Sequence, residues 1–255
     1  MRARARRAAV SAASTVLVGV LATAGCGRSG LTGGDDKDAA RAHGATAYTK
    51  VAALPERMSA DGTTVVVGSP DAETVVHVYE DMRCPVCQEF EREGGGEALQ
   101  KLALTGEVRL EYTFASFLSD KSHLGGSGSR KAANALRAAV DRGKFTELHK
   151  LLFLHQPEEV VDGYTDAFLL RTASQVDGLR GKKFDAAVRT MKYGDFVEAS
   201  QKAFDDDGAD GTPGFAINGN LVPEHLRGGM FDAELLPLVV RMLAGGVTPP
   251  PDQVG

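Results

Sequence analysis

The sequence predicts an α/β fold in which a small sheet is interrupted by a long helical insertion. Two strand-like apolar runs occupy residues 63–68 and 74–79, and a third, 108–114, alternates with a period of two. No strand pattern occurs between Phe117 and Gly211, where helical spacing dominates. A hairpin pattern at 214–222 and a final helix then complete the domain.

Length, charge and cysteine count narrow the class of protein. The 255 residues suit one domain with an insertion or tails, and a hydrophobic content of 43% is enough for a core. The net charge is −5, and without the four arginines of the first 25 residues it is −5 − 4 = −9. An acidic chain argues against nucleic acid as a partner. Three cysteines, Cys26, Cys84 and Cys87, are too few for a disulfide scaffold.

The N-terminus has the pattern of a signal peptide over residues 1–25. Four arginines lie in the first seven residues, and a short Ala-rich apolar run follows them up to Ala24. The segment Thr23-Ala24-Gly25-Cys26 resembles the bacterial lipobox, with Thr23 where Leu is usual. We therefore expect lipid on Cys26 and anchoring to the cell membrane. A plain signal peptide with a stray cysteine, and hence a secreted protein, is the alternative.

Composition then separates a linker, a domain and a tail. Residues 26–47 are predicted to hold the lipidated cysteine and a flexible linker rich in Gly, Ala and Asp, and about 20 such residues reach roughly 25 Å. The domain is expected at 48–246 and a Pro-rich tail at 247–255. The stretch 48–61 fits either a short helix or an extended segment.

The first half of the domain alternates strands and helices. The run 74–79 is almost continuously apolar, so it is expected to be a central strand. The helix after Cys87 is expected to break at Gly94-Gly95-Gly96, since each Gly costs about 1 kcal/mol relative to Ala in a helix. Strand 108–114 should have one polar face.

The helical insert is expected at about 119–195. Its predicted helices, and the helix that returns to the sheet, span 129–141, 145–155, 165–176, 184–191 and 196–204. Ser129 is a candidate N-cap of the first. Asn218-Gly219 is a strong hairpin signal, and Asp232 is a candidate cap of the last helix, 232–244.

The segment Cys84-Pro85-Val86-Cys87 contains the candidate catalytic residues, its two cysteines. It follows a strand and opens a helix, which is the setting that gives a C-x-x-C pair redox function. Pro85 suits the first helical position. Cys84 then lies at the helix N-terminus, where the dipole and free N–H groups stabilise its thiolate. Cys87 lies one turn further on, where we expect it to be more buried and able to attack a mixed disulfide at Cys84.

Two separated motifs resemble one family. The segments 80–87, Glu-Asp-Met-Arg-Cys-Pro-Val-Cys, and 211–219, Gly-Thr-Pro-Gly-Phe-Ala-Ile-Asn-Gly, resemble the thioredoxin superfamily and, within it, the DsbA-like thiol:disulfide oxidoreductases with a helical insert. The resemblance covers about 63–244. It implies a thioredoxin fold with an inserted helical domain. It also implies a cis Thr212-Pro213 bond beside the cysteines, where the Thr212 backbone pairs with an extended client.

Neighbouring charged residues leave alternatives open. Glu80 or Asp81 is a candidate to accept the proton of Cys87 as a buried acid, and members of the family often carry Asp at the position of Asp81. A solvated strand end is the alternative. Arg83 either favours the Cys84 thiolate or is a solvated cation of little effect. Strongly oxidising members often carry His where this chain has Val86, so the resemblance leaves strong oxidising power in doubt.

The predicted function is extracytoplasmic exchange of disulfides with client proteins through Cys84 and Cys87, with oxidation favoured over reduction. Expected partners are clients with free thiols or disulfides and a membrane redox partner, for a monomer that needs no cofactor or metal. The alternative is a thioredoxin-fold surface lipoprotein that binds a partner or metal without catalysis. A zinc site would need two further ligands beside the two cysteines. His77, inside a strand, is expected to be a satisfied core residue.

Overall fold

The computed structural model describes residues 46–120 and 125–250. All of them belong to one of two compact units, Asp35–Gly255; the other unit, Met1–Gly34, contains no described residue. The predicted signal peptide, Cys26 and nearly all of the linker therefore lie outside the described residues, as does most of the Pro-rich tail.

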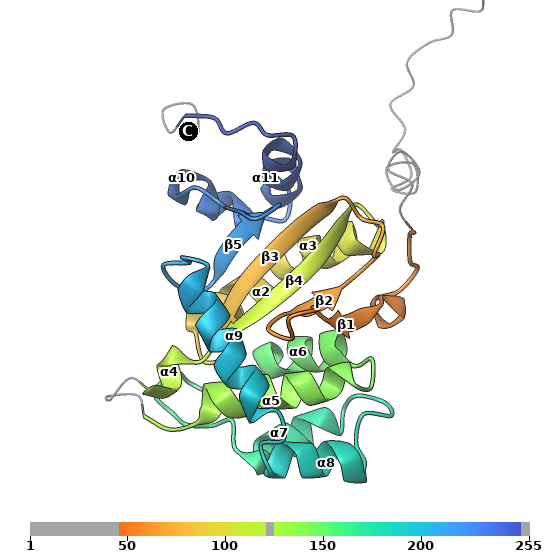
Figure 1. Ribbon diagram of the computed structural model, residues 1–255, viewed down its shortest axis with the longest axis vertical. Helices are drawn as coiled ribbons and strands as arrows, with labels where there is room; N and C mark the ends of the chain where they lie inside the picture. The colour runs from red at the N-terminus through yellow and green to blue at the C-terminus, as the bar shows by residue number, and fades with distance from the viewer. Residues whose placement is uncertain (1–45, 121–124, 251–255) are drawn as a thin grey trace, which may run out of the picture. The chain divides into compact units, whose positions relative to one another are not determined.

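A six-stranded mixed sheet forms the centre of the domain (Figure 1). Its strands, in chain order, are β1 (Glu56–Met58), β2 (Val65–Val67), β3 (Thr74–Asp81), β4 (Val108–Ala115), β5 (Gly214–Ile217) and β6 (Asn220–Leu221). Their order in space is β1-β2-β4-β3-β5-β6, with β3 parallel to β4 and every other pair antiparallel. The apolar run 74–79 is thus an interior strand, as predicted, and it ends at the cysteine motif.

Helices cover both faces of the sheet (Figure 1). The helices α2 (Pro85–Arg92), α3 (Gly95–Leu104) and α11 (Leu235–Ala244) lie on one face, and α9 (Gly194–Asp206) crosses the other face against β4. The Ser200 hydroxyl accepts a 2.8 Å hydrogen bond from the backbone N–H of Phe114, which ties α9 to β4.

The described part of the helical insert, which excludes residues 121–124, contains five helices between β4 and α9. They are α4 (Phe117–Asp120), α5 (Gly128–Val140), α6 (Phe145–Leu154), α7 (Asp166–Ala173) and α8 (Lys182–Arg189). The chain therefore has the predicted α/β thioredoxin fold with an inserted helical domain. The insert packs around α5, and its helix α6 also contacts α2. That contact brings α6 side chains to the back of the cysteine motif.

The stretch 48–61, left undecided by the sequence, contains a 3₁₀ turn, η1 (Val51–Ala53), and the edge strand β1. Only three residues form β1, and the strand exists because it pairs with β2. The carboxylate of Glu56 on β1 also accepts hydrogen bonds of 2.7 and 2.8 Å from the backbone N–H groups of Phe145 and Thr146. These two groups open α6, so the edge strand supplies the cap of an insert helix, a contact that no local pattern reveals.

The observed ends of the helices agree in part with those predicted from the sequence. The predicted break falls at Gly94, which has φ of 130°, whereas Gly95 and Gly96 already belong to α3. The prediction of Ser129 as an N-cap was wrong, because α5 begins at Gly128 and the side chain of its cap, Ser127, accepts no capping bond. Asp232 does cap the last helix, since its carboxylate accepts bonds from the N–H groups of residues 234 and 235. The short helices α10 (Glu224–Arg227) and η2 (Gly228–Met230) were not predicted.

The predicted hairpin is present between β5 and β6. Asn218 and Gly219 have φ of 50° and 79°, the left-handed values that the favoured two-residue hairpin turn requires. The Asn218 side chain also accepts a 2.8 Å bond from the N–H of Val75, so the turn is held against the start of β3. The segment that follows the proline loop is thereby held against the strand that leads to the cysteines.

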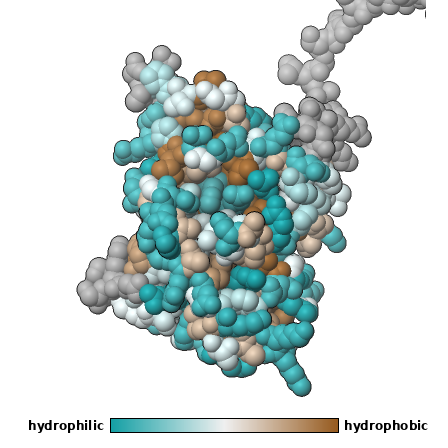
Figure 2. All heavy atoms as spheres, viewed as in Figure 1, coloured by the Kyte–Doolittle hydropathy of each residue, from teal (hydrophilic) through white to brown (hydrophobic). Residues whose placement is uncertain are grey.

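The described surface is mainly hydrophilic in the view of Figure 2, and hydrophobic residues gather at the end of the domain that carries α10 and α11. The large side chains exposed on α11 are those of Leu235 and Leu238. Over the described residues, no helix combines the length and the apolar character that crossing a bilayer requires.

Candidate active site

The cysteine motif forms the turn between β3 and α2. Cys84 is the N-cap of α2, with φ of −71° and ψ of 121°, and Pro85 is the first helical residue. The missing N–H of Pro85 costs nothing there, because the first N–H groups of a helix have no partner within it. Cys84 keeps 7% of its surface exposed, whereas Cys87 has none. The expected difference in burial between the two cysteines is confirmed.

The surroundings of Cys84 favour its thiolate and lower its pKa to about 6. The hydrogen bond from the Cys87 thiol is the largest cause, and the Thr212 side chain and the backbone N–H groups of Cys87 and Val86 act in the same direction, against the effect of burial. Val86 therefore contributes through its backbone, although its side chain has no donor. Arg83 is not among these causes.

Cys87 has the opposite properties. Burial raises the pKa of its thiol well above the usual value, and the hydrogen bond to Cys84 and the charge of Glu80 raise it further. The pair thus combines one thiolate near the surface with one protonated thiol beneath it, which is the asymmetry that thiol–disulfide exchange uses.

The loop before β5 lies against Cys84. The Thr212–Pro213 peptide bond is cis, as predicted. The Cys84 thiol donates a 3.2 Å hydrogen bond to the backbone oxygen of Thr212, so the proline loop and the cysteine motif are in direct contact although 128 residues separate them. Two of the sequence-predicted site residues, Thr212 and Pro213, therefore lie at the site.

The two acids at the end of β3 are fully buried, so the alternative of a solvated strand end was wrong. Asp81 accepts backbone hydrogen bonds on both oxygens, at 3.0 Å from Arg83 and 3.1 Å from Leu118. Burial raises its pKa, and these donors oppose the rise. Asp81 thus holds the turn between β3 and α2, whereas Glu80 lies toward Cys87. Burial raises the pKa of Glu80 well above normal, and the charge of Cys84 raises it further.

Arg83 is not the solvated cation that one interpretation of the sequence expected. It is 1% exposed, and its guanidinium donates to the backbone oxygens of Leu118, Gly125 and Glu159 at 3.2, 2.6 and 2.6 Å. These oxygens belong to three separate parts of the insert, namely α4, the segment before α5 and the segment between α6 and α7. The alternative of a favourable neighbour of the thiolate finds no support either, because the guanidinium is bound to the insert.

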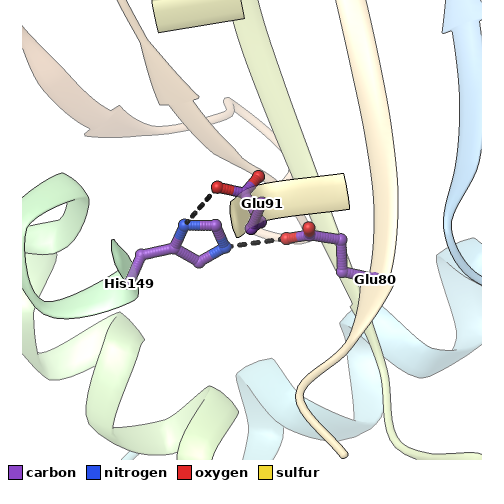
Figure 3. Close-up of side chains that lie close together, drawn as sticks. All are labelled: Glu80, Glu91 and His149. Carbon is purple, nitrogen blue, oxygen red and sulfur yellow. Dashed lines mark hydrogen bonds and ion pairs between the residues drawn. The ribbon is translucent and has the colours of Figure 1, made fainter. Parts of the chain in front are cut away.

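Two buried side chains beside the site, those of Glu91 and His149, were missed by the sequence analysis. His149 of α6 lies between two carboxylates, with Nε2 at 2.7 Å from Glu80 Oε2 and Nδ1 at 3.9 Å from Glu91 Oε2 (Figure 3). All three side chains are at most 3% exposed. This group of three also has donor atoms close enough to hold a metal ion.

A signal for both residues was present in the sequence. Glu91 lies four residues after Cys87 and therefore on the same face of α2. His149 lies on the apolar face of α6, four residues after Phe145 and four before Phe153. A polar residue in a buried helical stripe is the informative observation, because such a residue needs a partner across the interface.

Burial raises the pKa of Glu91 to about 8, with the nearby Glu80 charge adding to it and His149 opposing it. The unfolded chain releases this proton near pH 4.5, the normal value, whereas the folded chain keeps it until about pH 8. Because the folded state then binds more protons, this group makes the protein less stable as pH rises from about 4.5 to about 8. We expect Glu91→Gln to flatten this decline and to be more stable than wild type above pH 8.

Urea unfolding of the reduced protein at several pH values measures this effect. The exposed Glu89→Gln on the same helix is the matched control and should keep the wild-type pH dependence. An equal decline in Glu91→Gln and wild type would show that Glu91 ionises in the folded state at its normal pKa.

Two glutamines hold the insert to the redox motif. Gln156, just after α6, donates from Nε2 to the backbone oxygens of Met82 and Cys84 at 2.8 and 3.0 Å. Gln88 of α2 donates in return to the backbone oxygen of Phe153 at 3.0 Å. His77 lies away from this site and bonds Thr113 at 2.8 Å, in agreement with the expected core role.

A family model described as Thioredoxin matches residues 60–233, which is more than half of the chain. The chain belongs to the thioredoxin family. The match includes β3, both cysteines, the insert and the cis-proline loop, so all the described site residues fall within the family region.

Several solved structures share the fold at low sequence identity. BdbD from Bacillus subtilis is 20% identical, with 76% of this chain and 98% of that chain covered and a TM-score of 0.61. MdbA, a thiol-disulfide oxidoreductase from Corynebacterium matruchotii, is 20% identical, with 74% and 94% covered and a TM-score of 0.57. DsbA from Mycobacterium tuberculosis is 22% identical, with 74% and 98% covered and a TM-score of 0.52.

Two curated relatives are much longer proteins. Na(+)/H(+) antiporter NhaA 3 of Salinispora tropica is 29% identical over 154 residues, and NhaA 1 of Salinispora arenicola is 31% identical over 159 residues. In each case the match takes in 60% of this chain and 21% of the relative. The similarity thus concerns about a fifth of each antiporter chain.

Proposed function

We propose that this protein is an extracytoplasmic thiol:disulfide oxidoreductase that exchanges disulfides with client proteins through Cys84 and Cys87. The observation that carries the proposal is the asymmetry of the pair. Cys84 has a pKa of about 6 at a helix N-terminus beside a cis-proline loop, and Cys87 is buried and protonated. The fold shared with MdbA, a thiol-disulfide oxidoreductase by its description, supports it.

The exchange proceeds through a mixed disulfide at Cys84. In the oxidising direction a client thiolate attacks Cys84 Sγ of the Cys84–Cys87 disulfide, and Cys87 leaves as a thiolate that takes up a proton. A second client thiolate then attacks the client sulfur, and Cys84 leaves as a thiolate. The client loses two electrons and the protein gains them, so an oxidising partner must restore the disulfide.

Stabilisation of the Cys84 thiolate favours the reduced protein, and so it makes the disulfide a better oxidant. A pKa of about 6 lies between those of thioredoxin, about 7, and of DsbA, about 3.5. We therefore propose oxidation as the main direction, with a driving force weaker than that of the strongest oxidants. This agrees with Val86, whose side chain offers no donor to the thiolate.

We further propose that the protein acts outside the cytoplasm, tethered to the cell membrane by lipid on Cys26. The basic head, apolar run and lipobox-like segment of residues 1–26 support this location. A disulfide persists in that oxidising compartment. The clients are extracytoplasmic proteins with exposed cysteines, and the partner oxidant belongs to the membrane.

The reduction potential of the Cys84/Cys87 couple, measured by equilibration with glutathione at pH 7, tests the proposal. We expect a value between about −270 mV, as in thioredoxin, and about −120 mV, as in DsbA. A value at or below about −270 mV would reverse the proposed direction. The absence of a reversible couple would leave the non-catalytic binding module as the function.

A further inference from the structure

We propose that Glu80, His149 and Glu91 form a proton path that joins Cys87 to a surface pocket at the far end of α2. The inference rests on the proposed function and extends it, because it assigns positioning roles to two side chains outside the cysteine and proline motifs. His149 comes from the insert, so the path gives the inserted domain a part in the chemistry.

The need for such a path follows from burial. Cys87 and Glu80 have no exposed surface, and Cys84, above them, has 7%. A client joined to Cys84 covers this small opening. The Cys87 proton must nevertheless leave before Cys87 can attack the mixed disulfide, and must return when Cys87 is released as a thiolate.

Side chains behind Cys87, on the side away from Cys84, offer a route for this proton. Glu80 lies near Cys87, close enough for its charge to raise the pKa of the Cys87 thiol. His149 continues the line, with one ring nitrogen toward Glu80 and the other toward Glu91 (Figure 3). Glu91 lines a surface pocket of about 230 Å³, together with Arg92, Glu97, Gln100, Lys150 and Leu154.

The pocket lies at the opposite end of α2 from the client. Glu91 is seven positions beyond Cys84, or roughly 10 Å along a helix. The distance of 3.9 Å between His149 Nδ1 and Glu91 Oε2 exceeds a hydrogen bond, so the carboxylate must move by about 1 Å to close the path. The carboxyl groups of Glu80 and Glu91 are also close enough to hydrogen-bond each other, which requires a proton on one of them. Both side chains are buried, and a buried carboxylate without a proton or a charged partner is costly, so each readily takes a proton.

The groups around His149 come from several elements. Glu56 of β1 and Glu91 of α2 raise its pKa through their charges, but burial is the larger effect and keeps the pKa low. The ring of Tyr112 on β4 lies 5.1 Å away, and Lys150 acts on Glu91. A neutral imidazole can accept a proton at one nitrogen while it releases one from the other.

The same three residues also have the spacing of a metal site, because one donor atom from each lies within 4.8 Å of the others. The two carboxylates nevertheless face different nitrogens of His149 (Figure 3). An imidazole between two acids is the arrangement that passes a proton. The effect of a chelator, given below, distinguishes a proton path from a metal site.

The Cys87 thiol gives its proton to the Glu80 carboxylate, Glu80 passes it through His149 to Glu91, and Glu91 releases it to water in the pocket. The Cys87 thiolate then attacks Cys84 Sγ, forms the Cys84–Cys87 bond and expels the client thiolate. The protein loses two electrons and the former client disulfide gains them. In the oxidising direction each transfer runs in reverse.

A single-turnover experiment can follow the release of the proton and the release of the client thiolates separately. The reduced protein reacts with a symmetric disulfide of a peptide that carries an aromatic thiol, because aromatic thiolates are coloured and do not take up protons at pH 7. Each turnover then releases two thiolates and one proton, and the second thiolate marks the attack by Cys87. A pH-indicator dye in weak buffer follows the proton.

In the wild type, we expect the proton and the second thiolate to appear together. In Glu91→Gln and His149→Ala, the proton should lag by about tenfold or more, in line with the loss of a general acid–base group. Imidazole, which can enter the space left in His149→Ala, should remove the lag of that variant. Glu97→Gln, in the same pocket but ion-paired to Lys101 at 3.0 Å, is the control and should show no lag.

Three results would count against the path. Simultaneous release in both folded variants would show that the proton leaves by another way. A lag in His149→Ala that imidazole does not shorten would indicate a structural role for His149. A wild-type rate that falls on addition of a chelator would favour a metal at this cluster. A wild-type protein that never releases the second thiolate would instead refute the proposed function itself.

Discussion

Replacing Cys84 with serine is expected to reduce disulfide exchange to the rate without protein, whereas Cys87→Ser should stop the reaction at a client joined to Cys84. Of the two cysteines that the structure describes, only Cys84 is both partly exposed and mainly thiolate at neutral pH, since its pKa of about 6 leaves roughly ten thiolates for each thiol at pH 7. Cys87 is fully buried and protonated, so it acts only after the first attack has occurred.

Alkylation with iodoacetamide over a pH series measures this difference. In the wild type the rate should rise with a midpoint near pH 6 and label Cys84 first, as peptide mass spectrometry will show. Cys26→Ser is the control and should leave both the midpoint and the exchange rate unchanged. A midpoint near the ordinary thiol pKa, or first labelling at Cys87, would contradict the proposed roles of the two cysteines.

Replacing Arg83 with methionine is expected to lower the free energy of unfolding by about 2–4 kcal/mol. Methionine fills much of the same space but leaves the backbone oxygens of residues 118, 125 and 159 without their donor. An unsatisfied buried acceptor costs about 1–3 kcal/mol, and two of these three oxygens are only partly buried, which reduces the sum.

Denaturant unfolding with intrinsic fluorescence or circular dichroism gives the measurement. Arg92→Met, at the exposed end of α2, is the matched control and should change stability by less than about 0.5 kcal/mol. The alkylation midpoint of Cys84 should stay near pH 6 in Arg83→Met, because Arg83 is not among the groups that stabilise the thiolate. Unchanged stability with a raised midpoint would instead make Arg83 a direct partner of Cys84.

Much of the site follows from local rules. The strand 74–81, the turn with Cys84 and the helix that Pro85 opens are encoded within about 20 consecutive residues, and burial and helix-dipole arguments already order the two thiols. Gly94 and the pair Asn218-Gly219 mark turns through their own backbone preferences. These features could be predicted because each depends on neighbours in the chain.

Contacts across the fold decided the rest. Whether Glu80 and Asp81 were solvated or buried depended on the insert, since the backbone N–H of Leu118 in α4 binds Asp81 and His149 of α6 binds Glu80. The role of Arg83 could only be assigned once the insert was in place around its guanidinium. The strand β1 is too short to be recognised alone and exists through its pairing with β2.

The sequence by itself thus determined the redox motif, its strand–turn–helix setting and the helical nature of the insert, because periodicity and helix-end chemistry act over a few residues. The tertiary structure alone decided that Glu91 and His149, 58 positions apart, meet Glu80 behind Cys87. The physical reason is that a buried polar side chain takes the partner that packing brings within 3 Å or so, and no local pattern encodes which partner that is.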